Sequence, residues 1–350
     1  MIIRSGYECE EHNVYTPDGY LLVVHRVIKL GKPATGRPVF MMHGCMMSSE
    51  IWVCLRSAKH CLPFVLVEAG YDVWLGNVRG NKYCQKHVTL KPSSLEFWDF
   101  SLEETIQCDV PCMIDYMLAC CRPFEKVVYI GFSQGTTQGF AALSLIDSLN
   151  DKVSLLIGLS ATTKPKGMTN RLVKALTKTS PELLFLFFSR KIFIRSVSFW
   201  RNVMSPVMFT QSIDWCQHQL FGWDGKHIRP HDKIIAYQHL YAFTSSKLIV
   251  HWFQIMRSNC LQMFDEGSPV QFGDGHVVPQ YRLKAIRTPI ALFIGGRDSL
   301  VDNDYTKRHL DHCTIHVEEL EEYEHLDFLW AHNVDTKIYP HILHLLAHNI

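Results

Sequence analysis

The sequence predicts an α/β fold in which a mostly parallel central sheet is covered by helices on both faces. Short apolar runs rich in Val, Ile and Leu alternate with longer stretches of helical pattern, and this alternation is typical of parallel sheets. The 350 residues are 47% hydrophobic and 20% charged. That composition supplies a large core and argues against disorder.

Seven strands and at least two long helices are expected. Turn residues precede the first two strands: Asp18 and Gly19 in one case, Gly36 and Pro38 in the other. The clearest helical candidates are residues 102–118 and 136–149. The predicted strands are residues 21–24, 39–42, 71–75, 127–130, 153–159, 290–294 and 314–317.

The alternation of strands and helices stops in the second half of the chain. Residues 161–286 are mostly helical in pattern and rich in aromatic side chains. We therefore expect a core made of residues 1–160 and 287–350, with residues 161–286 inserted on top of the sheet as a mainly helical cap or lid.

The first part of the expected cap has an unusual charge balance. Residues 161–201 hold nine basic residues and one acid, Glu182, a local excess of +8 in a chain whose net charge is +1. Within them, residues 183–188 are six large apolar residues in a row. One interpretation is a core helix of the cap with solvated Lys and Arg around it. The other is a lid that contacts an anionic lipid surface, where apolar insertion and charge attraction act together.

Composition also excludes several classes of protein. With Lys+Arg at 35 and Asp+Glu at 34, the chain lacks the basic excess of a general nucleic-acid binder. No run of 18 apolar residues predicts a transmembrane helix, and residues 1–6 lack the apolar core of a signal peptide. The twelve cysteines form no CxxC pair, which favours reduced thiols in a cytosol-facing protein, and we expect no metal site and no cofactor.

A nucleophile motif lies between a predicted strand and a predicted helix. Residues 131–135 read Gly-Phe-Ser-Gln-Gly, the only G-x-S-x-G in the chain. In this context the tight turn needs small residues around the serine and presents its Oγ at the carboxyl end of the sheet. Ser133 is the candidate nucleophile. The alternative is an ordinary glycine-bounded turn in which Ser133 caps the helix.

A serine nucleophile needs a histidine base and an acid that orients it, and after a strand–turn–helix serine the acid precedes the histidine in the chain. Asp298 follows the strand at 290–294 and is the candidate acid. His325 follows the strand at 314–317 and is the candidate base. The alternatives are Asp302 and Asp304 for the acid, and His312, His316 and His332 for the base.

The oxyanion of an acyl-transfer intermediate needs two backbone N–H donors. The residue after the nucleophile, Gln134, is the first candidate. The second is Cys45, in the loop that follows strand 39–42, with Met46 as runner-up. Cys45 could itself act as a nucleophile, but no helix start surrounds it. His43 is expected to support this loop.

These residues resemble the acid lipase family of α/β-hydrolases, which includes gastric and lysosomal lipases and fungal steryl ester hydrolases. The resemblance runs nearly end to end and implies the α/β-hydrolase fold. The matching segments are residues 6–20, 43–52, 70–81, 97–101, 295–298 and 324–327. We interpret the polar and aromatic residues Glu10, His12, Asn77, Arg79 and Trp98 within them as structural.

The closest resemblance is to the fungal lipid-droplet steryl ester hydrolases. Residues 189–191 and 249–254 are similar to that branch. Such enzymes usually carry a hydrophobic segment before the catalytic domain, whereas here the family signature begins almost at the first residue. Either the chain is truncated or it relies on the lid surface alone. Trp252, Phe253, Met256 and Met263 are expected to line an acyl pocket or to form the core of the cap.

The resemblance implies a carboxylic ester hydrolase acting on large apolar esters, whereas the residues alone indicate a serine hydrolase with a large apolar insertion. We expect a sterol esterase at the lipid droplet or the cytosolic side of the endoplasmic reticulum membrane, held there through its basic apolar lid. Triacylglycerol lipase is the nearest alternative. An acyltransferase and a non-catalytic lipid-surface protein are the others.

Overall fold

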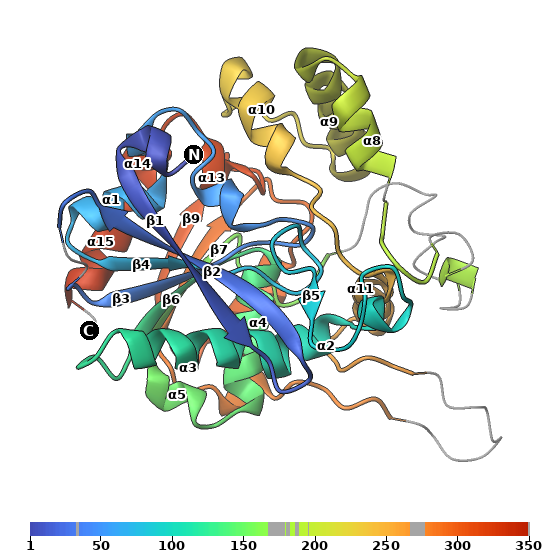
Figure 1. Ribbon diagram of the computed structural model, residues 1–350, viewed down its shortest axis with the longest axis horizontal. Coiled ribbons are helices and arrows are strands. Elements are labelled where there is room, and N and C mark those ends of the chain that lie inside the picture. Colours follow the sequence, from blue (N-terminus) through green and yellow to red (C-terminus); the bar gives the residue numbers. More distant parts are fainter. Residues whose placement is uncertain are drawn as a thin grey trace.

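The computed structural model describes residues 1–32, 35–166, 179, 183–185, 189–194, 196–266 and 277–348. Within these residues, one sheet of nine strands forms the centre of the molecule, and helices lie on both of its faces (Figure 1). The strands are β1 (Tyr7–Tyr15), β2 (Tyr20–Lys29), β3 (Pro38–Met42), β4 (Asp72–Leu75), β5 (Lys86–His87), β6 (Val127–Phe132), β7 (Val153–Leu159), β8 (Ile290–Gly295) and β9 (Thr314–Leu320).

The sheet is mixed, with its parallel part next to the candidate site. Its order is β1-β2-β4-β3-β6-β7-β8-β9, and β5 pairs with β2. The pairings of β1 with β2 and of β2 with β4 and β5 are antiparallel, whereas every pairing from β4 to β9 is parallel. The predicted mostly parallel α/β sheet is confirmed. The carboxyl ends of β6 and β8, which carry predicted site residues, therefore meet at one edge of the sheet.

All seven predicted strands are present, and β1 and β5 are additional. The parallel strands were predictable because they are buried on both faces, as the continuous burial of β3, β4, β6 and β8 shows. In β1 only Tyr7 and Val14 are buried, and the residues between them are mostly polar. An edge strand of this kind carries little of the alternating hydrophobic pattern that identifies strands.

Helices cover both faces of the sheet. The helix predicted at 102–118 is present with a π-helical turn inside it, and the one predicted at 136–149 ends earlier than expected. The helices of the core are α1 (Leu62–Glu68), α2 (Leu102–Glu104), the π-helical η5 (Thr105–Asp109), α3 (Val110–Cys120), α4 (Gln134–Leu145), α5 (Leu149–Lys152), α12 (Asn303–Leu310), α13 (Asp327–Trp330), α14 (Val334–Lys337) and α15 (Tyr339–His348). The short 3₁₀ turns are η1 (Ile3–Ser5), η2 (Ser49–Trp52), η3 (Ala58–His60), η4 (Glu96–Trp98), η6 (Tyr237–His239) and η7 (Leu283–Ala285).

The apolar side chains form two buried clusters, one on each side of the sheet. The first joins the sheet to α3 and α4, with Met113 and Phe140 fully buried. The second joins it to α1, α13, α14 and α15, with Phe64 and Ile342 buried. Each face is therefore closed by its own set of helices, as expected for a sheet with short helical connections.

Above the carboxyl edge of the sheet lie the helices contributed by residues 161–286. They are α8 (Ser196–Val203), α9 (Pro206–Phe221), α10 (Pro230–Ala236) and α11 (Ser246–Ser258). In Figure 1, α8 and α9 lie side by side at the outer end of the molecule. The described residues of this region add no strand to the sheet. Of the apolar run 183–188, Leu184 is buried against the core, and residues 186–188 lie outside the described residues.

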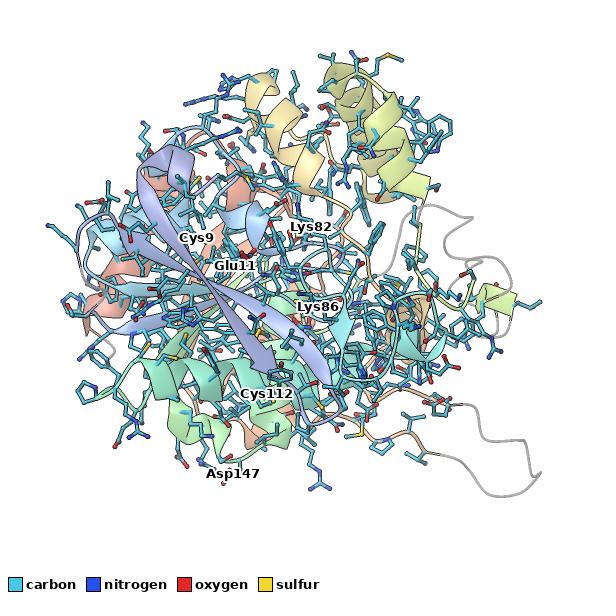
Figure 2. All side chains as sticks on the ribbon, viewed as in Figure 1. Cys9, Glu11, Lys82, Lys86, Cys112 and Asp147 are labelled. Carbon is cyan, nitrogen blue, oxygen red and sulfur yellow. The ribbon has the colours of Figure 1, made fainter. Side chains whose placement is uncertain are left out.

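Two general expectations concern thiols and membranes. All twelve cysteines are free, including Cys9 on β1 and Cys112 on α3, which are labelled in Figure 2. Across the described ranges, every helix is too short or too polar to span a bilayer.

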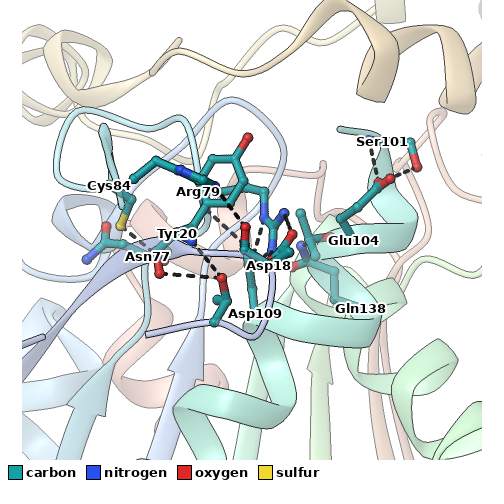
Figure 3. A network of polar contacts seen from close by, with 12 residues as sticks. Asp18, Tyr20, Asn77, Arg79, Cys84, Ser101, Glu104, Asp109 and Gln138 are labelled. Carbon is teal, nitrogen blue, oxygen red and sulfur yellow. Dashed lines mark hydrogen bonds and ion pairs between the residues drawn. The ribbon is translucent and has the colours of Figure 1, made fainter. Parts of the chain in front are cut away.

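Arg79 is a buried cation under the loop that follows β4. Its guanidinium makes an ion pair with buried Asp109 at 2.7 Å and another with Asp18, and its face lies over the Tyr20 ring at 4.2 Å from the centroid (Figure 3). The backbone N–H of Arg79 also donates to Asp109 at 3.0 Å. These contacts connect the β1–β2 turn, the β4 loop and the π-helical turn, which confirms that Arg79 is structural.

Candidate active site

Ser133 occupies a strained turn between β6 and α4. Its φ of 52° lies in the left-handed region that non-glycine residues rarely adopt. The flanking glycines make the turn possible: a Cβ on Gly135 would lie 2.4 Å from the carbonyl oxygen of Met42, and one on Gly131 would lie 2.7 Å from the amide nitrogen of Thr136. The motif at 131–135 therefore forms the strand–turn–helix elbow that the sequence predicted.

The three candidate residues Ser133, His325 and Asp298 lie in one hydrogen-bonded row. Nε2 of His325 is 2.8 Å from Oγ of Ser133, and Nδ1 of His325 is 2.7 Å from Oδ2 of Asp298. All three are buried, with Ser133 only 8% exposed. A histidine in this position can take the serine proton on one nitrogen while the aspartate holds the other nitrogen protonated.

The alternative residues lie elsewhere or have other roles. Asp302 caps α12, accepting from the N–H of Tyr305 at 3.0 Å, and it pairs with Lys164 at 2.9 Å. Asp304 is exposed on the same helix. His312 and His332 contact backbone carbonyl groups, and His316 lies on β9 beside Glu318.

His325 is held by neighbours that the sequence analysis did not identify. The hydroxyl of Ser160 donates to its backbone carbonyl at 2.8 Å. The Trp223 ring stacks on the imidazole, with centroids 5.3 Å apart and an interplanar angle of 5°. Trp223 belongs to the cap region, so the cap covers the candidate base directly. An isolated tryptophan between α9 and α10 carries no sequence pattern that would have shown this role.

The loop after β3 lies against the elbow. A Cβ on Gly44 would lie only 3.2 Å from Cβ of Ser133, tighter than an ordinary van der Waals contact, so glycine favours the close approach of the loop backbone. His43 supports the loop: Nδ1 contacts the carbonyl oxygen of Gly44 at 2.8 Å, and Nε2 accepts from the N–H of Val78 at 3.3 Å. Burial lowers the pKa of His43 to about 4, so this histidine is neutral at physiological pH.

The two candidate oxyanion donors flank this contact. Gln134 is the first residue of α4, and the N–H groups of a first helical turn have no acceptor within the helix. Cys45 follows Gly44 in the loop, before Met46, whose φ is 55°. Burial raises the pKa of the Cys45 thiol to about 12, so it is protonated at neutral pH, which argues against a nucleophilic role for it.

The cap contacts both parts of this site. The indole N–H of Trp252, on α11, donates to the side-chain oxygen of Gln134 at 2.8 Å. The N–H of Ala242 donates to the carbonyl oxygen of Met46 at 2.6 Å. Trp252 and Phe253 are buried in the core cluster, and Met256 and Met263 pack against its edge. Of the two interpretations of these four residues, this packing agrees with cap core.

Part of the acidic run before and after His325 has a structural role. The Glu324 carboxylate accepts from the N–H groups of Asp224 and Gly225, at 3.0 and 2.8 Å, in the cap region. Asp327 accepts from the N–H of Glu324 at 2.7 Å, and burial raises its pKa. Glu324 therefore ties the loop that carries His325 to the cap, whereas other acidic residues of the run, such as Glu322, are solvated.

Sequence comparison places this chain among known hydrolases. A family model described as "alpha/beta hydrolase fold" matches residues 37–332, and one described as "Partial alpha/beta-hydrolase lipase region" matches residues 1–56. Human gastric triacylglycerol lipase is 36% identical over 318 residues, which cover 86% of this chain and 78% of that protein. The chain belongs to the acid lipase family of α/β-hydrolases. A "Probable lipase" of Schizosaccharomyces pombe is 44% identical to this acid lipase family member over 85% of the chain, and the match spans 66% of that relative's length.

Solved structures agree with the fold of this acid lipase family member. An esterase from Thermogutta terrifontis superimposes with a TM-score of 0.54 at 14% identity, covering 97% of this chain and 98% of that one. An epoxide hydrolase from Vigna radiata gives a TM-score of 0.57 at 13% identity, covering 98% and 99%. At such low identity these likenesses concern the fold alone.

Proposed function

We propose that the chain is a carboxylic ester hydrolase of large apolar esters, with Ser133 as nucleophile, His325 as base and Asp298 as the orienting acid. The observation that carries the proposal is the continuous row of hydrogen bonds from Ser133 through His325 to Asp298 at the carboxyl edge of a parallel sheet. Membership in a family whose matched relatives are named as lipases supports the same reaction class.

The mechanism follows from the contacts. His325 takes the proton from Ser133 Oγ, which attacks the ester carbonyl, while the N–H groups of Gln134 and Cys45 stabilise the oxyanion. Collapse of this intermediate expels the alcohol, which takes the proton from His325. Water, deprotonated by His325, then attacks the acyl-enzyme and releases the fatty acid, and Ser133 recovers its proton.

We infer steryl esters as the preferred substrates, with triacylglycerols as the second candidate. The steryl ester proposal is supported by residues 189–191 and 249–254, which are similar to fungal steryl ester hydrolases. The triacylglycerol alternative is favoured by the 36% identity to human gastric triacylglycerol lipase. Both substrates are bulky and apolar, in agreement with a large cap above Ser133.

Hydrolysis of emulsified cholesteryl oleate and triolein, side by side, tests these proposals. The Ser133→Ala variant serves as the blank and is expected to release no oleate. Faster release from cholesteryl oleate supports the steryl ester proposal, and faster release from triolein replaces it with the triacylglycerol alternative. Ester products formed from an added alcohol would indicate acyl transfer. A Ser133→Ala variant that keeps most of the activity would overturn the site assignment.

We further propose that the cap docks on a lipid surface through the outer face of α8 and α9. Six large apolar side chains there are between 49% and 65% exposed. The rings of Phe199 and Trp200 pack edge to face, with their centroids 5.4 Å apart. These six residues, here named the α8–α9 face, are Phe199, Trp200, Val203, Val207, Met208 and Trp215. An exposed patch of this kind marks a protein or membrane contact. Such docking would place the enzyme at a lipid droplet or at the cytosolic face of the endoplasmic reticulum membrane.

Flotation with phospholipid-coated oil droplets tests this surface. Changing Phe199, Trp200 and Trp215 together to Ser is expected to leave most of the protein in the aqueous phase. The matched control is Leu30→Ser with Val88→Ser, which removes apolar side chains on the core that are at least as exposed. Equal flotation of both variants would contradict the assignment of the α8–α9 face. Hydrolysis of a water-soluble short-chain ester should be unchanged in both.

A further inference from the structure

A cluster of three metal-ligating side chains lies outside the active site, where the edge strand β9 meets α15. His316 and Glu318 are two residues apart on β9, so their side chains project from the same face of the strand. His341 lies in the first turn of α15. One ligand atom from each residue lies within 4.8 Å of the other two.

The spacing of these atoms fits a single bound ion. Oε2 of Glu318 lies 3.5 Å from Nε2 of His316 and 3.4 Å from Nδ1 of His341. Zinc binds imidazole nitrogen and carboxylate oxygen at about 2.0–2.2 Å in tetrahedral geometry, which places neighbouring ligand atoms roughly 3.4 Å apart. The two contacts with the carboxylate therefore already have the length of a tetrahedral edge.

One of the three ligands is poorly satisfied by the protein alone. Nε2 of His316 is shielded from solvent and makes no hydrogen bond within the described ranges, although it faces the Glu318 carboxylate at 3.5 Å. A shielded nitrogen that lacks a hydrogen bond is unfavourable, and a bound cation would satisfy it. The His341 side chain is 45% exposed, which leaves a path by which an ion can enter.

We propose that His316, Glu318 and His341 bind one Zn²⁺ ion, with water completing its coordination. Two imidazoles and one carboxylate are ligands that suit zinc. The ion would join β9 to α15 and stabilise their packing. Because the cluster lies along β9, whereas His325 follows its carboxyl end, the ion would have no part in ester hydrolysis. The proposal departs from the expectation of no metal site, which depended on sequence motifs, because ligands at 316, 318 and 341 follow no zinc motif.

Titration of the chelator-stripped, reduced chain with Zn²⁺ tests the proposal. Calorimetry is expected to show a saturable histidine-dependent site at one ion per chain, and zinc should raise the midpoint of thermal unfolding by several degrees. His341→Ala should weaken this site by about tenfold or more, since it removes one of three ligands. Hydrolysis of a soluble ester should be the same with and without zinc, which separates this proposal from the proposed function.

The neighbouring histidines supply the matched control. His344 and His348 lie one turn apart on α15, with ring centroids 4.2 Å apart, and could bind an ion on their own. The double change His344→Ala with His348→Ala is expected to leave the affinity unchanged. Loss of binding in this control but not in His341→Ala would overturn the proposal. So would zinc binding, for example to free thiols, that is equal in His341→Ala and the parent chain.

Discussion

Trp252 on cap helix α11 donates its indole N–H to the side chain of Gln134, the residue directly after the proposed nucleophile. The contact joins two residues 118 positions apart and ties the cap to the first turn of α4. Because the N–H of Gln134 is a proposed oxyanion donor, this bond makes Trp252 a candidate positioning residue.

We expect Trp252→Phe to lower kcat about fivefold and to leave KM nearly unchanged. The change removes one buried hydrogen bond, worth about 1 kcal/mol, and keeps most of the apolar packing. Gln134→Leu should give a similar loss, and the double variant should be no worse than either single variant. Steady-state kinetics on a soluble ester measure this, with the exposed Trp215→Phe as control. Additive losses would mean that the two side chains act independently.

Asp298→Asn should reduce kcat by about 10⁴-fold, because an amide favours the wrong tautomer of the histidine. The matched control is Asp302→Asn, in the same loop: asparagine still caps α12, so the change removes mainly the charge that pairs with buried Lys164 and costs about 2 kcal/mol of stability. Steady-state kinetics and urea unfolding separate the two effects. A larger kinetic loss in Asp302→Asn would reassign the acid.

Glu50 links the loop after β3 to the cap. Burial alone would raise its pKa, but contacts with His239 (2.7 Å), Lys82 (2.5 Å) and Tyr83 (2.6 Å) outweigh this and lower the pKa to about 2. Since the folded pKa is below the unfolded value of 4.5, the stabilisation is complete above pH 4.5 and is lost as the pH falls towards 2.

Glu50→Gln should therefore lower the free energy of unfolding by an amount that depends on pH. We expect a loss on the order of 2 kcal/mol near pH 7 that shrinks between pH 4.5 and pH 3. Urea unfolding across this range measures it, with the solvated Glu321→Gln as control. A difference that stays constant with pH would contradict the assignment.

Arg79→Lys should destabilise the fold by about 3 kcal/mol, because lysine cannot reproduce the forked contacts with buried Asp109 and with Asp18. Urea unfolding measures the loss, and the exposed Arg56→Lys should have almost no effect. An equally stable Arg79→Lys chain would mean that charge alone, and not the fork, matters here.

The sequence predicted the positions that depend on local order along the chain. Ser133 and Asp298 each follow a recognisable apolar strand, His325 follows the last strand of the sheet, and parallel strands bring their carboxyl ends together. The contacts between the cap and the core were not predictable in this way. The contacts of Trp223 with His325 and of Trp252 with Gln134 join residues about a hundred positions apart. The sequence around these tryptophans carries no pattern that predicts how the cap packs against the sheet.

The separation of the site residues along the chain has a consequence for biosynthesis. Ser133 and His325 are 192 positions apart, and Asp298 lies between them. During translation the elbow residues leave the ribosome long before the proposed base and acid. On this proposal, the serine of a nascent chain cannot attack cellular esters until both later strands have joined the sheet.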